Sequence, residues 1–213
     1  MSTLTHKALL QRLSSRGKKR LCLTPLLSQR QIGDASIDVR LGNQFIVFRM
    51  HRLESYPGRR RSGFADVRRI QERHVLRYGE TFVLHPGALA LASTLEYLSM
   101  PADLECQVEG RSSWARVGLE VATATAVEPG FRGVVTLELS NVGTVPLSLS
   151  PGLRISQLVF REAAPAVRLD GRSHKYHYSV GPEFSRLEQD PDLKVFMKEA
   201  RGSDDDGTSS EGP

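Results

Sequence analysis

The sequence is short of cysteine and of aromatic residues, and it has no long apolar run. Its two cysteines, Cys22 and Cys106, stand isolated among 213 residues, which excludes a disulfide framework and a paired set of cysteine metal ligands. A reducing compartment is the simplest context, so we expect a cytoplasmic protein. No apolar run approaches the roughly 20 residues of a membrane helix, and charged residues interrupt the N-terminus, so we expect no membrane span and no signal peptide.

The composition favours one β-rich domain. Hydrophobic residues make up 39% of the chain and aromatic residues only 7%, which predicts a core of Val, Leu, Ile and Ala. We expect a single domain over residues 1–200, followed by a disordered acidic tail over 201–213 that has no apolar side chain. The net charge of +5 fits a polyanionic partner, but it does not separate a nucleotide triphosphate from nucleic acid or from a solvated surface.

The apolar pattern predicts one short helix and then many strands. Thr5 to Leu13 has helical spacing, and from Ser36 onward short apolar runs alternate with Gly and Pro, which is the rhythm of an all-β fold. The predicted strands are Ile37–Leu41, Phe45–Phe48, Thr81–Leu84, Ala88–Ser93, Val134–Leu139, Leu147–Leu149 and Ile155–Phe160. We expect residues 56–77 to form a surface loop that carries a short helix at Val67 to Val75. This segment includes a basic cluster at Arg59 to Arg61.

The segment from Gly110 to Gly118 has the composition of a phosphate-binding turn. Arg111, Ser112 and Ser113 precede a predicted short helix that Gly118 ends. A guanidinium, two hydroxyls and backbone N–H groups together suit phosphate oxygens. Ser112 and Arg116 are four residues apart and share one helix face. Alternatively, the serines only cap the helix and Arg111 is solvated.

A second segment combines a turn at Glu128 to Gly133 with an alternating strand that contains Glu138. A period of two places Val135, Leu137 and Leu139 on one face, and Val134, Thr136 and Glu138 on the other. Glu138 therefore meets either bulk water or a pocket, where a partly desolvated carboxylate could transfer protons.

Both segments resemble the signature motifs of dCTP deaminases. They read Val-Glu-Gly-Arg-Ser-Ser-Trp-Ala-Arg-Val-Gly-Leu from Val108 and Thr-Leu-Glu-Leu-Ser-Asn from Thr136. Further motifs follow in the family's order: Ser36 to Gly42, His85 to Gly87, Pro101 to Leu104 and Pro151 to Ile155. Agreement in both order and spacing over roughly 150 residues identifies the chain as a member of this family.

The resemblance implies a mainly β, distorted jelly-roll barrel of the dUTPase-like type, assembled as a homotrimer with nucleotide sites between subunits. It also implies hydrolytic deamination of magnesium-complexed dCTP to dUTP and ammonia, within pyrimidine deoxynucleotide metabolism and dTTP precursor supply. Neither nucleic acid nor a membrane is expected as a partner. The zinc ligand set H-x-E with P-C-x-x-C is missing from the sequence, so we expect no protein-bound cofactor and no catalytic zinc.

The resemblance also implies residue roles. Glu138 would take a proton from the water that attacks C4 of cytosine, Ser112 and the Ala124 backbone would hold that water, and Arg116 would orient Glu138. The substrate-binding residues would be Arg111, Ser113, Glu128, Phe131, Thr136, Leu137, Lys175 and Ser179. Among them, Phe131 would lie against the deoxyribose, and Lys175 would belong to a C-terminal segment that folds over the triphosphate.

Four positions depart from the family pattern. Glu128 replaces a usual Asp, Asp170 replaces a usual Tyr, and Ser179 replaces a usual Gln. Ala122 replaces a usual His in a regulatory stretch, so feedback by dTTP is not assumed. These departures keep several alternatives open: a bifunctional enzyme that continues to dUMP and diphosphate, a deaminase of another cytosine nucleotide, or a nucleotide-binding regulator without turnover. The intact Ser112, Arg116 and Glu138 argue against the regulator.

Overall fold

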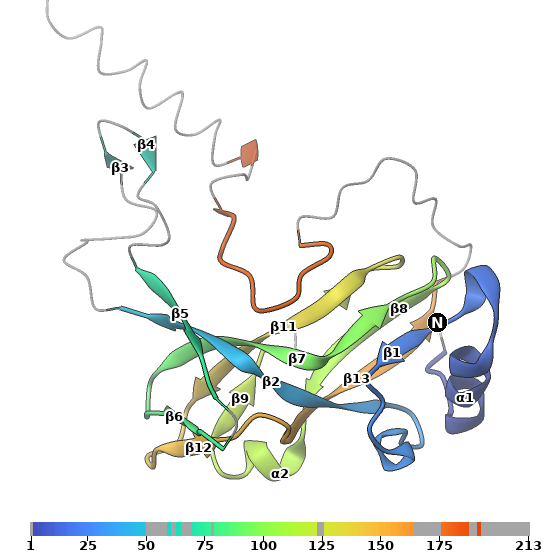
Figure 1. The fold of residues 1–213 in the computed structure, drawn as a ribbon, viewed down its shortest axis with the longest axis horizontal. Helices are drawn as coiled ribbons and strands as arrows, with labels where there is room; N and C mark the ends of the chain where they lie inside the picture. Colours follow the sequence, from blue (N-terminus) through green and yellow to red (C-terminus); the bar gives the residue numbers. More distant parts are fainter. Residues whose placement is uncertain are drawn as a thin grey trace, which may run out of the picture.

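A curled antiparallel sheet forms the centre of the molecule (Figure 1). The computed structural model describes residues 2–49, 59–60, 63–64, 70–77, 79–122, 126–163, 176–187 and 191–192. Nine strands run in the order β10-β8-β13-β2-β7-β11-β9, with β1 added beside β7 and β5 beside β2. The predicted mainly β fold, a distorted jelly-roll with a short N-terminal helix, is confirmed.

Among the described residues, the helices that can be delimited are α1 (His6–Ser14), η1 (Gly17–Lys19), η2 (Gln29–Gln31) and α2 (Ser112–Ala115). The strands of the large sheet are β1 (Cys22–Thr24), β2 (Ile37–Phe48), β5 (Gln71–Val75), β7 (Leu89–Ser99), β8 (Leu104–Gly110), β9 (Leu119–Val121), β10 (Ala126–Val127), β11 (Arg132–Asn141) and β13 (Arg154–Glu162). Two further pairs are β3 (Arg59–Arg60) with β4 (Gly63–Phe64), and β6 (Phe82–Leu84) with β12 (Leu147–Leu149).

Strand β11 has the two faces that its alternation predicts. Val135, Leu137 and Leu139 are each at most 3% exposed and belong to the main core. Thr136 is half-buried and Glu138 is exposed on the opposite face. Period-two alternation therefore fixes which side of β11 can meet a ligand.

The neighbouring strand β7 bulges where it meets β11. Val134 pairs with Tyr97 and Thr136 pairs with Ser93, so Val135 alone faces three residues of β7, from Thr94 to Glu96. The Thr94 hydroxyl accepts a hydrogen bond from the Val135 N–H at 2.9 Å and donates one to the Glu96 carbonyl at 2.8 Å. This bulge sets the register of the part of β11 that carries Thr136 and Glu138.

The Glu96 carboxylate ends in the core beneath this bulge. Only 1% of Glu96 is exposed. One of its oxygens accepts from Gln31 Nε2 at 2.9 Å, and the other accepts from the Arg40 N–H at 2.8 Å. The Gln31 amide oxygen in turn accepts from the N–H groups of Leu27 and Ser28. Desolvation raises the pKa of Glu96, against the opposing effect of these hydrogen bonds.

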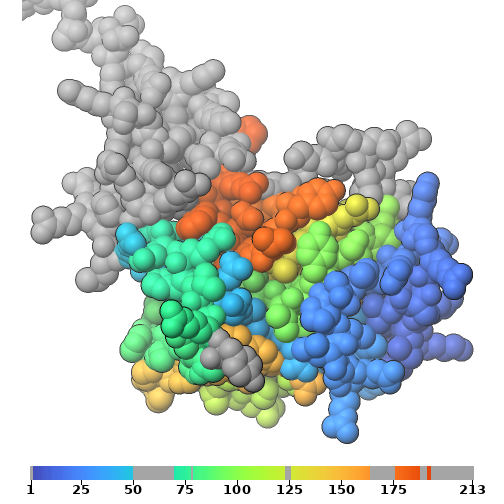
Figure 2. Space-filling view, in the orientation of Figure 1, coloured from blue at the N-terminus to red at the C-terminus, as the bar shows by residue number. Residues whose placement is uncertain are grey.

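The C-terminal segment, defined here as residues 176–187, lies across the start of β11. The Val134 N–H donates to the Ser179 carbonyl at 2.9 Å, the Ser179 hydroxyl donates back to the Val134 carbonyl at 2.8 Å, and the Tyr178 N–H donates to the Arg132 carbonyl. Gly133 has φ of 151°, and a Cβ there would lie 2.7 Å from Ser179 Oγ. A glycine is therefore required where the two backbones meet. In Figure 2 this segment, in orange, covers the ends of β11 and β5.

Most predicted elements are confirmed, with differences in extent. The helix predicted over Thr5 to Leu13 is α1, and the two strands predicted between Ile37 and Phe48 form one continuous strand, β2. The helix predicted at Val67 to Val75 is wrong over 71–75, which forms β5 because β2 offers it a full antiparallel partner. The single domain predicted over 1–200 stays a prediction, and the tail at 201–213 lies outside the described residues.

Candidate functional site

The segment from Arg111 to Gly118 folds as the predicted turn and short helix. The N–H groups of Trp114 and Ala115 both donate to the Arg111 carbonyl, and the Arg116 N–H donates to the Ser112 carbonyl at 3.1 Å. Ser112, Ser113 and Arg116 are exposed. Three backbone donors are thus used inside the turn, and its two hydroxyls and the Arg116 guanidinium are exposed to solvent.

The end of this turn is fixed by close backbone contact. Gly118 has φ of 95°, and a Cβ there would lie 2.7 Å from the backbone of Gly143. The chain then continues into β9, which pairs with the end of β11. The Ala122 N–H donates to the Glu138 carbonyl at 2.9 Å. The short helix α2 is therefore connected through one strand to the backbone of Glu138.

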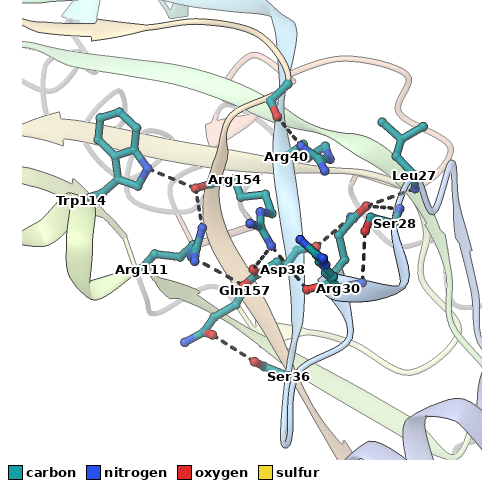
Figure 3. A network of polar contacts seen from close by, with 12 residues as sticks. Leu27, Ser28, Arg30, Ser36, Asp38, Arg40, Arg111, Trp114, Arg154 and Gln157 are labelled. Carbon is teal, nitrogen blue, oxygen red and sulfur yellow. Dashed lines mark hydrogen bonds and ion pairs between the residues drawn. The ribbon is translucent and has the colours of Figure 1, made fainter.

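A carboxylate on β2 ties two arginines together behind this turn (Figure 3). Arg154 Nη1 lies 3.1 Å from one oxygen of Asp38, and Arg111 Nε lies 3.6 Å from the other. The Asp38 side chain is 16% exposed, whereas those of Arg111 and Arg154 are 31% and 35% exposed. One carboxylate for two guanidiniums leaves a local excess of positive charge that reaches solvent.

The backbone of Arg154 supports the same cluster. Its carbonyl accepts from the indole Nε1 of Trp114 at 3.1 Å and from Arg111 Nη1 at 3.3 Å. The turn is thereby fastened to β13 by one aromatic and one basic side chain. Two partly exposed guanidiniums beside two serine hydroxyls form a surface suited to phosphate oxygens. Sequence interpretation found Arg111 but missed Asp38 and Arg154, whose only signal was their presence in the family motifs.

Glu138 lies on the solvent-facing side of β11, away from the core. Its carboxylate makes no hydrogen bond or ion pair with other described residues, and none of the described contacts links it to Ser112 or Arg116. The structure therefore brings the predicted residues together in two groups on one chain. Arg111, Ser112, Ser113 and Arg116 form the first group at α2, and the second group is on and around β11.

The second group combines the turn before β11 with the strand itself. Glu128 is exposed, and its carbonyl accepts from the N–H of Phe131, which closes the turn. Phe131 is half-buried and packs edge-on against His177 of the C-terminal segment, with ring centroids 5.7 Å apart. Leu137 is 1% exposed, so only its backbone can contact a nucleotide.

The C-terminal segment contacts the same strand face. The Thr136 hydroxyl accepts from the Glu183 N–H at 3.3 Å, and Ser179 is 4% exposed with its hydroxyl bonded to Val134. Ser179 therefore anchors the segment in this conformation. The predicted site residues Ala124 and Lys175 lie outside the described residues. So does Asp170, which stands where the family usually has Tyr.

We find no group of three or more His, Cys, Asp or Glu side chains with the geometry of a metal site among the described residues. No described helix is long and apolar enough to cross a membrane.

Burial raises the pKa of the Cys106 thiol, which lies in the core.

Comparison with known proteins identifies the family. Residues 3–163 match the model of the dCTP deaminase-like family. The chain belongs to this family. The match spans every described residue of both groups except those of the C-terminal segment.

Two relatives of the dCTP deaminase-like family illustrate the similarity. The dUMP-forming dCTP deaminase of Methanobrevibacter smithii is 38% identical over 199 residues, which cover 91% of this chain and all of the relative. The dCTP deaminase of Natronomonas pharaonis is 44% identical over 172 residues, which cover 75% of this chain and 83% of the relative. Among solved structures, the 2'-deoxycytidine 5'-triphosphate deaminase of Agrobacterium tumefaciens is 26% identical with a TM-score of 0.55. That match covers 76% of this chain and 48% of the other.

Proposed function

We propose that this protein is a dCTP deaminase, a hydrolase that converts dCTP and water to dUTP and ammonia. The observation that carries the proposal is the similarity to dCTP deaminases over 83 to 100% of their own length. The exposed carboxylate of Glu138 on β11 and the cationic turn at α2 supply the two chemistries that the reaction needs: proton transfer and binding of phosphates.

In the proposed mechanism, Glu138 removes a proton from a water molecule while the oxygen of that water forms a bond to C4 of cytosine. Glu138 then donates this proton to the C4 amino nitrogen, the C4–N bond breaks, and ammonia leaves. The Ser112 hydroxyl and the Ala124 backbone hold the water. Arg116 orients Glu138 and stabilises the charge that develops during the addition.

The remaining residues select the nucleotide. Phe131 packs against the deoxyribose, where a ribose 2′-hydroxyl would be crowded, and Glu128, Thr136 and the Leu137 backbone contact the sugar and base. Arg111, Ser113 and Lys175 bind the triphosphate. Ser179, whose hydroxyl is bonded to Val134, contributes by fixing the C-terminal segment that lies beside the sugar.

Metal ions enter as part of the substrate. We propose that dCTP binds as its Mg²⁺ complex, which reduces the charge that the arginines must neutralise. We also propose that catalysis is independent of zinc, because the sequence lacks the H-x-E and P-C-x-x-C ligands of zinc deaminases. Deamination that survives a zinc-selective chelator but weakens on removal of magnesium supports both points, and activity that depends on stoichiometric zinc refutes the second.

We also propose that the protein is a homotrimer and that it acts in the cytoplasm. Ser112, Arg116 and Glu138 are all exposed on one chain, as are the apolar side chains of Val117 and Val142 near the turn, at 54% and 69%. A neighbouring subunit would bring the α2 turn of one chain to the β11 face of another. Light scattering combined with activity measurements checks this, because an active monomer would contradict it.

A second candidate function is supported by one relative in particular. The Methanobrevibacter protein, matched over its whole length, is named dUMP-forming. A bifunctional enzyme would release dUMP and diphosphate after deamination, and Glu128 is the exposed carboxylate of the β11 turn that could serve a second water.

Product analysis separates these functions. The protein is incubated with dCTP, CTP and dUTP in parallel, and the mono-, di- and triphosphate products are separated. Formation of dUTP alone supports the monofunctional deaminase, and formation of dUMP and diphosphate supports the bifunctional enzyme. Turnover of none of the three nucleotides would refute both and favour the nucleotide-binding regulator.

The cationic turn leads to a further prediction. Arg111→Gln should raise the KM for dCTP about tenfold or more with a small effect on kcat, since a hydrogen bond to a charged group contributes roughly 1.5–3 kcal/mol. Steady-state kinetics of Arg111→Gln and Arg154→Gln measure whether the two guanidiniums share this role. A loss confined to kcat in Arg111→Gln would place Arg111 in the chemical step instead.

A further inference from the structure

Arg73 on β5 joins the C-terminal segment to the sheet from the side opposite β11. Its Nη2 donates to the Pro182 carbonyl at 2.8 Å, and its guanidinium carbon lies 5.3 Å from the centroid of the Phe184 ring. Arg73 Nη1 also lies 3.5 Å from the amide oxygen of Gln44 on β2. One side chain therefore combines a charge-assisted hydrogen bond with a cation–π contact to the segment.

The segment fits closely against β2 at the same place. A Cβ at Gly181 would collide with the side-chain amide of Gln44. Gly181 and Pro182 are both buried, whereas Val180 is 78% exposed. The backbone thus turns inward at 181–182, and Arg73 holds it there.

The other side of the segment contacts β11 close to the proposed catalytic strand face. Ser179 is bonded to Val134, and the Glu183 N–H donates to the hydroxyl of Thr136. Thr136 is two residues before Glu138 on the same face of the strand. The binding of residues 179–183 to β11 therefore fixes the Ser179 side chain and the Glu183 backbone near the strand face that carries Glu138.

We propose that Arg73 is a positioning residue for nucleotide binding, which holds the C-terminal segment on β11 of its own chain. The proposal rests on the proposed function, because it concerns the affinity of that site for dCTP. Arg73 acts through residues 181–184 and touches none of the proposed catalytic groups. Its loss unseats the segment and weakens nucleotide binding, while the chemical step at Glu138 is retained.

The test compares Arg73→Ala and Arg73→Lys with the wild-type protein. Arg73→Ala should raise the KM for dCTP about tenfold with kcat within about twofold, the loss expected when a charge-assisted hydrogen bond is removed. Arg73→Lys should recover part of the affinity, since lysine can still donate to Pro182 and lie over Phe184. Phe184→Leu, which keeps an apolar side chain without the π face, should show a smaller rise.

Hydrogen exchange of residues 176–187 measures the seating of the segment without reference to activity. The N–H groups of Tyr178 and Glu183 are bonded to β11, so they should exchange faster in Arg73→Ala. Arg49→Ala is the matched control, because Arg49 also lies beside β5 but pairs with Glu72 at 2.7 Å; it should leave both exchange and KM unchanged.

The two proposals fail in different ways. Absence of dCTP turnover by the wild-type protein refutes the proposed function. Unchanged exchange in Arg73→Ala refutes the positioning role of Arg73, and faster exchange with an unchanged affinity for dCTP refutes its link to nucleotide binding. A drop in kcat with constant KM would also overturn it.

Discussion

Glu138→Gln should lower kcat for dCTP deamination about a thousandfold while the affinity for the nucleotide changes little. Glutamine keeps the size of the side chain and can still donate and accept hydrogen bonds, but it cannot take a proton from water. A positioned general base typically contributes a factor of about 10²–10⁴ to the rate. Single-turnover kinetics together with equilibrium binding of dCTP separate the loss of chemistry from a loss of binding.

The adjacent strand offers a matched control for this variant. Glu120 on β9 is also exposed, and its partner on β11 is Ser140, two residues beyond Glu138. Glu120→Gln therefore removes a similar carboxylate from a similar strand position and should leave kcat unchanged. Substantial turnover by Glu138→Gln would exclude Glu138 as the proton-transfer group, and equal losses in both variants would point to a general effect of charge.

The largest effect on stability is expected from Glu96→Ala. This change leaves the Arg40 N–H and one N–H of Gln31 without acceptors and opens a cavity in the core beneath the β7 bulge. Each unsatisfied buried donor costs about 1–3 kcal/mol, and the cavity adds to this. We expect the free energy of unfolding to fall by roughly 3–5 kcal/mol, measured by urea denaturation.

Glu96→Gln, which does not titrate, reveals the pH dependence of this group. Because desolvation raises the pKa of Glu96 in the folded protein, the folded state binds the proton more tightly than the unfolded state. The part of the Glu96 contribution to stability that depends on proton binding is therefore fully present below the ordinary glutamate pKa and is lost as the pH rises through the raised value. The stability of the wild type relative to Glu96→Gln should fall over that pH range. A relative stability that rises with pH would contradict the raised pKa.

The local features of this molecule were predictable from sequence, and the long-range polar contacts were not. Alternation predicted the two faces of β11, and the Ser-Ser turn ended by Gly118 predicted α2. Strand β8 was missed although its buried Leu104, Cys106 and Val108 alternate with half-buried polar residues. Its alternation is the signal that would have found it.

The long-range contacts depend on partners that no sequence spacing brings together. Glu96 and Gln31 are 65 residues apart, and Arg73 and Pro182 are 109 apart. In the sequence, each of these residues looks like an ordinary surface or strand residue. It meets its partner because the sheet is curled. The error at 71–75 has the same origin, because the pairing of β5 with β2 outweighs a weak local preference for helix.

The reciprocal hydrogen bonds between Ser179 and Val134 have a thermodynamic consequence. They make the C-terminal segment an intramolecular ligand of β11, with its own equilibrium between bound and released states. Linkage between two ligands of one strand is symmetric. The factor by which the bound segment changes the affinity for the nucleotide equals the factor by which the nucleotide changes the binding of the segment to β11. Substitutions along 176–187 that change only the binding of the segment to β11 can therefore change the dissociation constant of the nucleotide through a single coupling free energy.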